Sequence, residues 1–518
     1  MFHRFCGSWR YGLIFFGLTL FAISIWAQEP PLQSGRYGGP RWKIAYASYE
    51  GTQRFAVDEL QRALQQYLPY VIETRPATQL DPAGANVILV GTAAENHLIA
   101  ELETKGLIQH PRQPQSYTIA CVESPWQRNM RVVIISGADE PGVLFGVVEF
   151  NKRLSALIPD DPARIRPTLD NLAFFSATEA PVIEHRGLWT WGYVIYDYRR
   201  FLDNMARLKM NRLTIWNDTP PINSKELIQY AHDRGIQVIF GFQWGWGTKL
   251  NLASEKDLAA VKEQVLLEYK NNYRGLGLDG IYFQTLTEHN HTVQDGHTIA
   301  SLATKWVNEI AQPLLQENPR LRIEFGLHAT SIQEHYPDLR SLDPRIVITW
   351  EDAGVTPYSY EPGVAVSHGQ EKDRPANPSA TIDYSKKIAT FRPGSEFAMI
   401  AKGWTTLRWS DEFEHHQPFI LGERSQAFIL NRARERQPRW DFVNARWMAY
   451  YPVALRFYRE LRETVKGPMT VQGLIEDGLF EERIQPSAAL LGEMLWNPNR
   501  SPEKYLRSAF NPYLEKVN

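Results

Sequence analysis

The sequence contains 518 residues, more than one compact hydrophobic core normally serves, so we expect two domains, one of them large. Its formal net charge of −2 excludes the strongly basic surface on which nucleic-acid binding depends. The hydrophobic fraction of 43% is ordinary, but 16 Trp and 23 Tyr residues supply many flat rings. These rings either fill a large core or stack on sugar rings, and composition leaves both interpretations open.

The first 27 residues have the pattern of a signal peptide. Arg4 and Arg10 precede the uncharged segment 11–27, and Ala27 precedes the polar sequence QEPP. A basic start, an apolar segment and a small residue before a polar stretch are typical of a cleavable export signal. We therefore predict cleavage near Ala27, a linker at 28–40, and a periplasmic or secreted protein. The alternative is an uncleaved membrane anchor, because 17 residues is near the lower limit for a span.

Cysteine usage argues against disulfides and zinc. Cys6 lies in the predicted signal peptide, so Cys121 is alone in the mature chain. An exported protein without a disulfide fits a bacterial periplasm or medium, and a fold large enough to stand on its own core. No Cys and His spacing is typical of a zinc site, and we predict neither a metal nor a cofactor.

Residues 41–160 are predicted to form a small α+β domain. Short apolar runs predict strands, and helical spacing of apolar residues predicts helices that begin near Thr52 and Pro141. The strand sequences are WKIAYA, NVILVGT, SYTIACVE and RVVIISGAD, and the predicted order is β-α-β-(α)-β-β-α. No candidate catalytic groups cluster in this domain.

From about Glu184 the pattern changes to strand and helix signals that alternate every roughly 30 to 40 residues. Seven such units, with an eighth strand predicted near 418–424, favour a closed barrel over an open parallel sheet. Residues 424–518 are predicted to be a helical extension. The predicted fold is therefore α/β: a (β/α)8 TIM barrel at 181–423, preceded by the small α+β domain and followed by a helical C-terminal region.

Barrels of this kind carry their functional groups at the C-terminal ends of the strands. Here those ends combine aromatic rings with carboxylate, amide, imidazole and ammonium groups, which suits a carbohydrate because rings stack on sugar faces and polar groups hold hydroxyls. Asp218 also suits a turn, and a strand-end histidine is often structural. Lys402 either meets a uronate carboxylate or pairs with a carboxylate of strand six. The candidate substrate-binding residues are Trp189, Trp191, Trp216, Asn217, Asp218, Trp244, Gln284, His289, His328, Trp350, Lys402 and Trp404.

Three carboxylates at strand ends are candidates for catalysis, namely Glu288 after strand four and Glu351 and Asp352 after strand six. Hydrolysis of a glycosidic bond normally needs two carboxyl groups, one to protonate the leaving oxygen and one to activate water or attack the sugar. Glu288 suits the acid, unless it is only a loop or helix-cap charge. One of the strand-six pair suits the base, and the sequence does not decide which.

Several segments resemble known glycoside hydrolases. RVVIISGADEPGVLFGVVEFNKRL, with Gly137, Gly142 and Gly146, is similar to the end of the domain that precedes the barrel in family-67 α-glucuronidases and family-20 β-N-acetylhexosaminidases. RGLWTWGYVIYDYRRFLDNMARLKMNRLTIWND resembles the start of their barrels, and AALLGEMLWNPNRSPEKYL resembles their C-terminal part. WEDAGVTPYSY is similar to a strand end of family-115 α-glucuronidases. The resemblance covers most of residues 41–515 at the level of pattern and order.

The resemblance implies an exported α-glucuronidase-like glycoside hydrolase that degrades polysaccharides or xylan side chains, with Glu288 as the acid and Glu351 or Asp352 as the base. Two positions depart from the families. Thr287 stands where family 20 has an Asp that orients an acetamido group, which favours uronates over acetamido sugars. Lys402 stands on strand seven, where the α-glucuronidases carry a further carboxylate.

Two other functions stay open at this stage. One is a β-N-acetylhexosaminidase-like exo-glycosidase, and the other is a non-catalytic carbohydrate-binding protein on a degenerate barrel, which the missing strand-seven carboxylate favours. In each case we expect a carbohydrate as partner, no nucleic acid, and no stable membrane span after signal removal. The oligomeric state is open and includes a homodimer. The insertion at 355–382, beside the proposed base, is a candidate lid.

Overall fold

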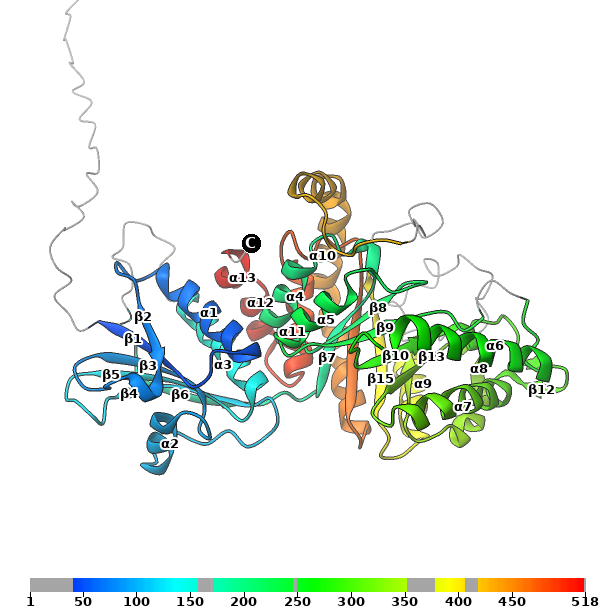
Figure 1. Cartoon of the computed structure of the whole chain (residues 1–518), viewed down its shortest axis with the longest axis horizontal. Helices are drawn as coiled ribbons and strands as arrows, with labels where there is room; N and C mark the ends of the chain where they lie inside the picture. The colour runs from blue at the N-terminus through cyan, green and yellow to red at the C-terminus, as the bar shows by residue number, and fades with distance from the viewer. Residues whose placement is uncertain are drawn as a thin grey trace, which may run out of the picture. The chain divides into compact units, whose positions relative to one another are not determined.

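The computed structural model describes residues 41–156, 169, 172–245, 249–351, 378–405 and 418–516 (Figure 1). Residues 41–518 form one compact unit. The predicted signal peptide and linker, the candidate base Asp352 and most of the insertion at 355–382 lie outside the described residues. Within the described part, no helix combines the length and the apolar character needed to cross a membrane.

A six-stranded sheet with the order β2-β1-β3-β5-β4-β6 makes up the N-terminal part. All neighbouring strands are parallel except β4, which is antiparallel to β5 and β6. Alternate side chains face opposite sides, so Ile88 packs with α1 and α3 whereas Leu89 packs with α2. The elements are β1 (Trp42–Tyr46), α1 (Gly51–Gln65), β2 (Glu73–Pro76), β3 (Asn86–Thr92), α2 (His97–Thr104), β4 (Tyr117–Glu123), β5 (Arg131–Gly137), α3 (Glu140–Ala156) and β6 (Phe175–Glu179).

The four strands expected here are present as β1, β3, β4 and β5, but β2 and β6 were not predicted. Both are short, and neither contains a fully buried residue. Each lies at an edge of the sheet, where a strand needs no continuous apolar sequence. Because β6 follows residue 160, the sheet extends beyond the predicted end of the small domain.

Eight parallel strands close into a barrel in the order β10-β13-β14-β15-β16-β7-β8-β9, with helices between successive strands, which confirms the predicted (β/α)8 fold (Figure 1). The strands are β7 (His185–Trp191), β8 (Arg212–Trp216), β9 (Gln237–Gly241), β10 (Gly280–Phe283), β13 (Arg322–Leu327), β14 (Ile346–Trp350), β15 (Phe397–Thr405) and β16 (Met469–Glu476). The main helices are α4 (Tyr198–Arg207), α5 (Ser224–His232), α6 (Glu255–Glu268), α7 (Ile299–Glu317), α9 (Pro378–Thr390), α10 (Gln426–Thr464) and α11 (Pro486–Trp496).

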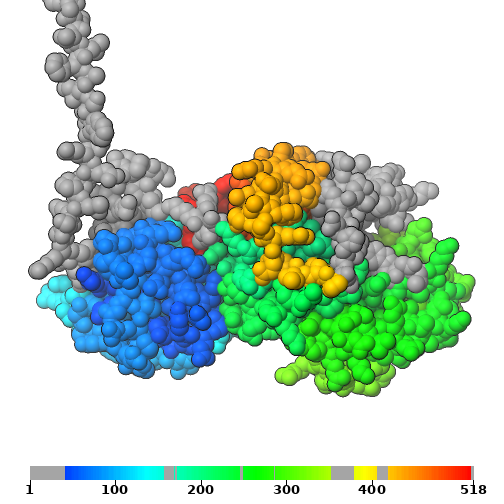
Figure 2. Space-filling view, turned by 45° about the horizontal axis from the view of Figure 1, so that its top comes forward, coloured from blue at the N-terminus to red at the C-terminus, as the bar shows by residue number. Residues whose placement is uncertain are grey.

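The eighth strand is not where the sequence suggested. Residues 418–424 form turns and a single β-bridge, whereas β16 closes the barrel from within the region predicted to be helical. The 39-residue helix α10 precedes it and is exposed in part at the surface, as the orange atoms of Figure 2 show. Thr470 and Gln472 of β16 bond inside the barrel, so the strand is polar on its inner side and lacks the apolar pattern of its neighbours. The barrel therefore extends to residue 476, beyond the predicted boundary at 423.

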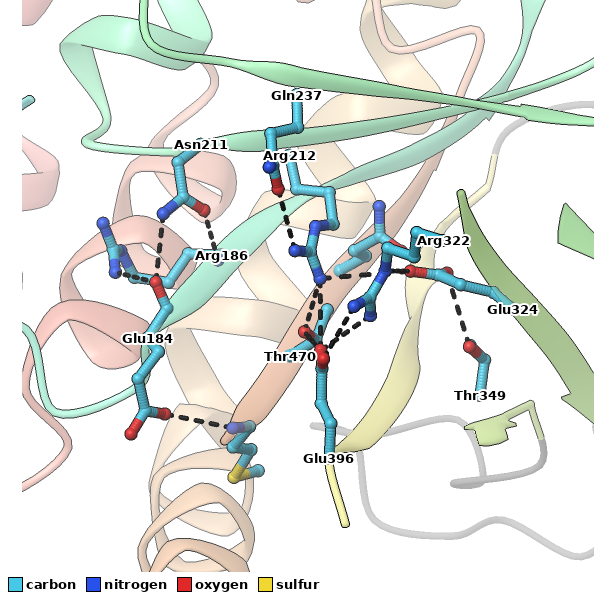
Figure 3. Close-up of polar contacts among 12 residues, drawn as sticks. Glu184, Arg186, Asn211, Arg212, Gln237, Arg322, Glu324, Thr349, Glu396 and Thr470 are labelled. Carbon is cyan, nitrogen blue, oxygen red and sulfur yellow. Dashed lines mark hydrogen bonds and ion pairs between the residues drawn. The ribbon is translucent and has the colours of Figure 1, made fainter. Parts of the chain in front are cut away.

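A network of buried charges fills the N-terminal end of the barrel, opposite the strand ends that were predicted to carry functional groups (Figure 3). Both terminal nitrogens of Arg322 donate to Glu396 over 2.6 Å, and Arg212 Nη1 donates to Thr470 Oγ1 over 2.7 Å. Burial raises the pKa of Glu396, but the hydrogen bonds and charge of Arg322 and Arg212 outweigh it and hold that pKa far below its usual range. Glu324 completes the network through Arg322. The paired charges form a rigid base beneath the barrel mouth.

Candidate active site

Four aromatic rings from the neighbouring strands β7 and β8 and from β10 form a floor inside the barrel. Trp189 contacts Trp191 and Tyr282, and Trp216 contacts the same two rings, with ring centroids 5.6–6.0 Å apart and edge-to-face angles. The four side chains share one buried cluster, which is separate from the core between strands and helices. We call these four rings the aromatic floor. Trp191 is its most exposed ring, at 6%.

Small residues make room for the aromatic floor. A Cβ atom at Gly241 would lie 2.4 Å from the Trp216 ring, and one at Gly326 would lie 2.5 Å from the Tyr282 hydroxyl. Neither contact is sterically possible without movement of a large buried ring. Glycine at these inward positions of β9 and β13 therefore allows the wide rings of the neighbouring strands to fill the barrel.

Three tryptophans predicted to line the mouth lie instead between the strands and the helices. Trp350 Nε1 donates to Ser385 Oγ of α9. Trp404 stacks on Trp447 of α10, and Trp244 stacks on Phe283. All three are fully buried in the outer core, so the expectation that Trp244, Trp350 and Trp404 contact a sugar is corrected. For Trp350 the physical reason is strand parity, since alternate residues of a strand face opposite sides. Trp404 follows an irregularity in the register of β15, and Trp244 lies after the end of β9.

Glu288 lies at the mouth, at the end of a short 3-10 turn that follows β10. Its side chain is 37% exposed, and Oε1 is 3.6 Å from Nε2 of His328, which follows β13. Gln284 Nε2 donates to the same oxygen over 3.5 Å, and Gln284 Oε1 accepts from the Tyr282 hydroxyl of the floor. The structure therefore brings together three of the predicted residues, Gln284, Glu288 and His328.

Thr287 fixes this corner of the site. It is fully buried, and its hydroxyl oxygen accepts from the backbone N–H of His328 while it donates to the carbonyl of Gly326, each over 3.1 Å. Its own carbonyl accepts from Ser331 Oγ over 2.6 Å. Thr287 thus joins the end of strand four to the loop after strand five, and its hydroxyl has a structural role at the position where an acetamido-orienting Asp would stand.

Glu351 occupies the end of strand six. Its backbone N–H donates to the carbonyl of Leu327, and its carboxylate lies 3.6 Å from the Lys402 ammonium of strand seven. Because Trp350 pairs with Leu327 in the register, Glu351 is the neighbour of His328 across the two strands. The side chain is only 6% exposed. Glu288 and Glu351 therefore flank His328 at the ends of strands four, five and six.

The end of strand eight and the turn after strand one contribute a carboxylate, Glu476, and a phenol, Tyr193, that sequence reasoning missed. Trp191 Nε1 donates to Oε1 of the fully buried Glu476, over 2.5 Å. Burial raises the pKa of Tyr193, and the nearby charges of Glu476 and Asp218 raise it further, so the phenol stays neutral. Glu476 was missed because β16 was not recognised as a strand; a carboxylate at a barrel strand end was the signal that would have found it.

Two predicted residues lie apart from these groups. The side chain of Asn217 is buried against Gly192, where a Cβ would come within 2.2 Å of Nδ2, so it packs the turn after strand one. The His289 ring lies 5.3 Å from that of His291, and burial, followed by the charge of His291, lowers the pKa of His289. Among the described residues, no group of three or more His, Cys, Asp or Glu is arranged to hold a metal ion.

Comparison with known proteins finds similarity at the level of the fold. No family model matches the sequence, and no curated protein matches it. One solved structure, a family GH115 4-O-methyl-α-glucuronidase with specificity for decorated arabinogalactans, aligns over 92% of this chain with a TM-score of 0.53 and 14% identity. Another, a GH138 enzyme that targets pectin rhamnogalacturonan II, aligns over 90% with a TM-score of 0.52 and 13% identity. The chain has a glycoside hydrolase fold.

The predicted resemblance to family 115 is thus confirmed at the level of the fold. The glycoside hydrolase fold here spans 59% of the first of these proteins and 52% of the second. At the barrel mouth of this chain, Glu288 lies beside His328, and Glu351 pairs with Lys402. Glu288 is partly exposed, whereas Glu351 is buried and paired with the Lys402 ammonium. Two carboxyl groups in such different surroundings can support acid–base chemistry.

Glu481 makes the turn after strand eight sensitive to pH. It is fully buried, Oε1 accepts from the backbone N–H groups of Tyr196 and Asp197, and Oε2 has no hydrogen-bond partner among the described residues. Burial raises the pKa of Glu481 to about 8, although the backbone N–H groups oppose the shift. The folded protein therefore keeps a proton that the unfolded chain loses near pH ~4.3.

We expect the free energy of unfolding to fall as pH rises between ~4.3 and about 8, by up to ~1.4 kcal/mol per pH unit from Glu481. Glu481→Gln removes this titration, so the variant should gain stability relative to the parent across that window. Urea unfolding at intervals from pH 5 to pH 9 measures both slopes, and Glu503→Gln, at an exposed helix position, is the control. Parallel slopes for parent and Glu481→Gln would show that Glu481 ionises normally.

Proposed function

We propose that this protein is an exported, α-glucuronidase-like glycoside hydrolase. The observation that carries the proposal is the pair of carboxyl groups, Glu288 and Glu351, on either side of His328 at one end of the barrel. Acid–base hydrolysis of a glycosidic bond requires two such groups at one site. The aromatic floor offers apolar ring surface of the kind that packs against sugars.

Glu288 is proposed as the general acid. Its exposure of 37% leaves the carboxyl group accessible to a leaving-group oxygen at the mouth. The 3.6 Å separation from His328 is too long for a hydrogen bond but short enough for a strong charge effect. A protonated His328 would stabilise the ionised Glu288, so the acid role requires a neutral imidazole.

Glu351 is proposed as the base that activates water. The Lys402 ammonium, 3.6 Å from Glu351, favours the ionised carboxylate that a base requires. A base that activates water for attack on the sugar carbon from the side opposite the leaving group gives hydrolysis with inversion. Asp352, the other candidate base, is distinguished from Glu351 by the substitutions described in the Discussion.

A uronate is proposed as the sugar. Lys402 holds a positive charge at the mouth, and a carboxylate on the substrate would share it with Glu351. The activity of the GH115 neighbour, a 4-O-methyl-α-glucuronidase, supports the same class of sugar. The buried, fully bonded Thr287 speaks against the hexosaminidase alternative, because its hydroxyl is engaged with Gly326 and His328.

The purified chain should be offered glucuronoxylan fragments, decorated arabinogalactan, and aryl α-glucuronides and β-N-acetylglucosaminides. We expect release of a uronic acid, which appears first as the β-anomer in a time course followed by NMR. Release of N-acetylglucosamine would favour the hexosaminidase instead. Binding of the oligosaccharides, measured by calorimetry, without any release would favour a carbohydrate-binding protein. The absence of both binding and release would contradict the proposal.

A further inference from the structure

Strand eight ends in a carboxylate that is held by the aromatic floor. Side chains of β16 alternate inward, from Thr470 and Gln472 in the barrel interior to Leu474 in the same buried cluster as the floor. Glu476 is the next inward residue, and it accepts the indole N–H of Trp191. The two atoms are 2.5 Å apart, at the short end of hydrogen-bond distances. Glu476 therefore restricts the orientation of the Trp191 ring.

The chain turns sharply and under strain directly after Glu476. Asp477 has φ +51° and Leu479 has φ +45°, a region that residues other than glycine rarely adopt. Between them, Gly478 has no room for a side chain, since a Cβ would lie 2.7 Å from both Ile475 and Trp440. Such strained backbone conformations persist only where many surrounding contacts hold them in place, and they are concentrated at functional sites.

Several contacts hold Asp477 in its strained conformation. Its carboxylate accepts from the Tyr196 hydroxyl and from Arg432 Nη2, each over 2.6 Å, and it lies 2.5 Å from Arg436 Nε. Trp440 Nε1 donates to its carbonyl over 3.0 Å. Tyr196 belongs to the loop after strand one, whereas both arginines belong to α10. These contacts fix the backbone of the turn and, through it, the position of Glu476.

We propose that Glu476 is a positioning residue of the sugar site, which holds the Trp191 indole in the orientation that a bound sugar ring packs against. This inference rests on the proposed function. Trp191 is the ring of the aromatic floor that is least covered, so it is the one best placed to meet a ligand from the mouth. Glu476 itself is fully buried and acts through Trp191.

The test measures affinity for a glucuronoxylan oligosaccharide by calorimetry, in a Glu288→Gln background that prevents turnover. Glu476→Met removes the acceptor, and Trp191→Phe removes the donor but keeps a ring. We expect each to weaken binding by ~10-fold, and the double variant to be no weaker than either single one, because both break one contact. Glu476→Gln should retain most of the affinity, since its amide oxygen still accepts the indole N–H.

An independent readout follows the contact itself. In the protein labelled with ¹⁵N-tryptophan, the indole N–H signal that Trp191→Phe removes should lie downfield in the parent and in Glu476→Gln, and shift upfield in Glu476→Met. Glu324→Gln, a buried glutamate at the opposite end of the barrel, controls for general loss of stability and should leave both affinity and this signal unchanged.

The failures of the two proposals are distinguishable. If the parent binds none of the sugars, the proposed function is wrong, and the positioning role for a sugar falls with it even where the indole signal shifts. If the parent binds but Glu476→Met binds as tightly, or if the two substitutions weaken binding additively, the positioning role is wrong while the function stands. Equal loss in Glu476→Gln and Glu476→Met would also overturn it, because that result indicates a need for the charge.

Discussion

Glu288→Gln should lower kcat for hydrolysis of the uronate-bearing substrate by ~10²–10⁴-fold, with a much smaller change in KM. The substitution keeps the size of the side chain and its contact with Gln284, but it removes the proton that the leaving oxygen needs. Initial rates on glucuronoxylan fragments and on an aryl glucuronide with an acidic leaving group measure the effect. The aryl substrate should suffer less, since a good leaving group depends little on an acid.

Glu255→Gln is a suitable control for Glu288→Gln, because Glu255 is 74% exposed at the start of α6, where it pairs with Lys305. Its kcat should match that of the parent. A Glu288→Gln variant that hydrolyses both substrates at the parent rate would exclude Glu288 as the acid. An equal loss on both substrates would also speak against it, since that pattern fits damage to the base or to binding.

Glu351→Gln is expected to have an effect of similar size, a fall in kcat of ~10²–10⁴-fold, because a neutral amide cannot take a proton from water. The amide has nearly the same shape as the carboxylate, so the variant should still fold and bind. It loses the charge attraction of Lys402 across 3.6 Å, and a modest fall in thermal stability should accompany the lost activity. Rates with and without added azide, a small anionic nucleophile, measure whether the missing step is attack on the sugar.

Asp352→Asn is the matched variant for this experiment, because the sequence left Glu351 and Asp352 as equal candidates for the base. If only Glu351→Gln loses activity and recovers with azide, Glu351 is the base. If only Asp352→Asn does so, the roles are exchanged and Glu351 serves to hold Lys402. Full activity in both single variants would contradict a strand-six base.

Regular alternation of strand and helix was enough to predict the barrel, because apolar strands separated by amphipathic helices have few other ways to bury their faces. Seven strands could be located in this way. The eighth could not, because Thr470 and Gln472 face the barrel interior and bond there to groups of other strands. A strand whose inner face is polar carries no hydrophobic signal, so only its partners reveal it.

The candidate site was predictable only as a set of strand ends. Glu288, Gln284 and His328 were expected near one another and are in contact, and Glu351 and Lys402 form the ion pair that the sequence allowed as one alternative. Of two successive residues at a strand end, the one that faces the mouth is decided by strand parity and by bulges, and both are set by the cross-strand register.

By itself, the sequence determined that this protein is a barrel with polar and aromatic groups gathered at its strand ends, because local periodicity and composition record what each segment must bury. The tertiary structure alone decided that Trp350 faces α9, while Glu351 pairs with Lys402. It also added Glu476, which was invisible until β16 was paired between β15 and β7. The reason is that a side chain's role follows from what lies opposite it, and residues 191 and 476 become neighbours only when the barrel closes.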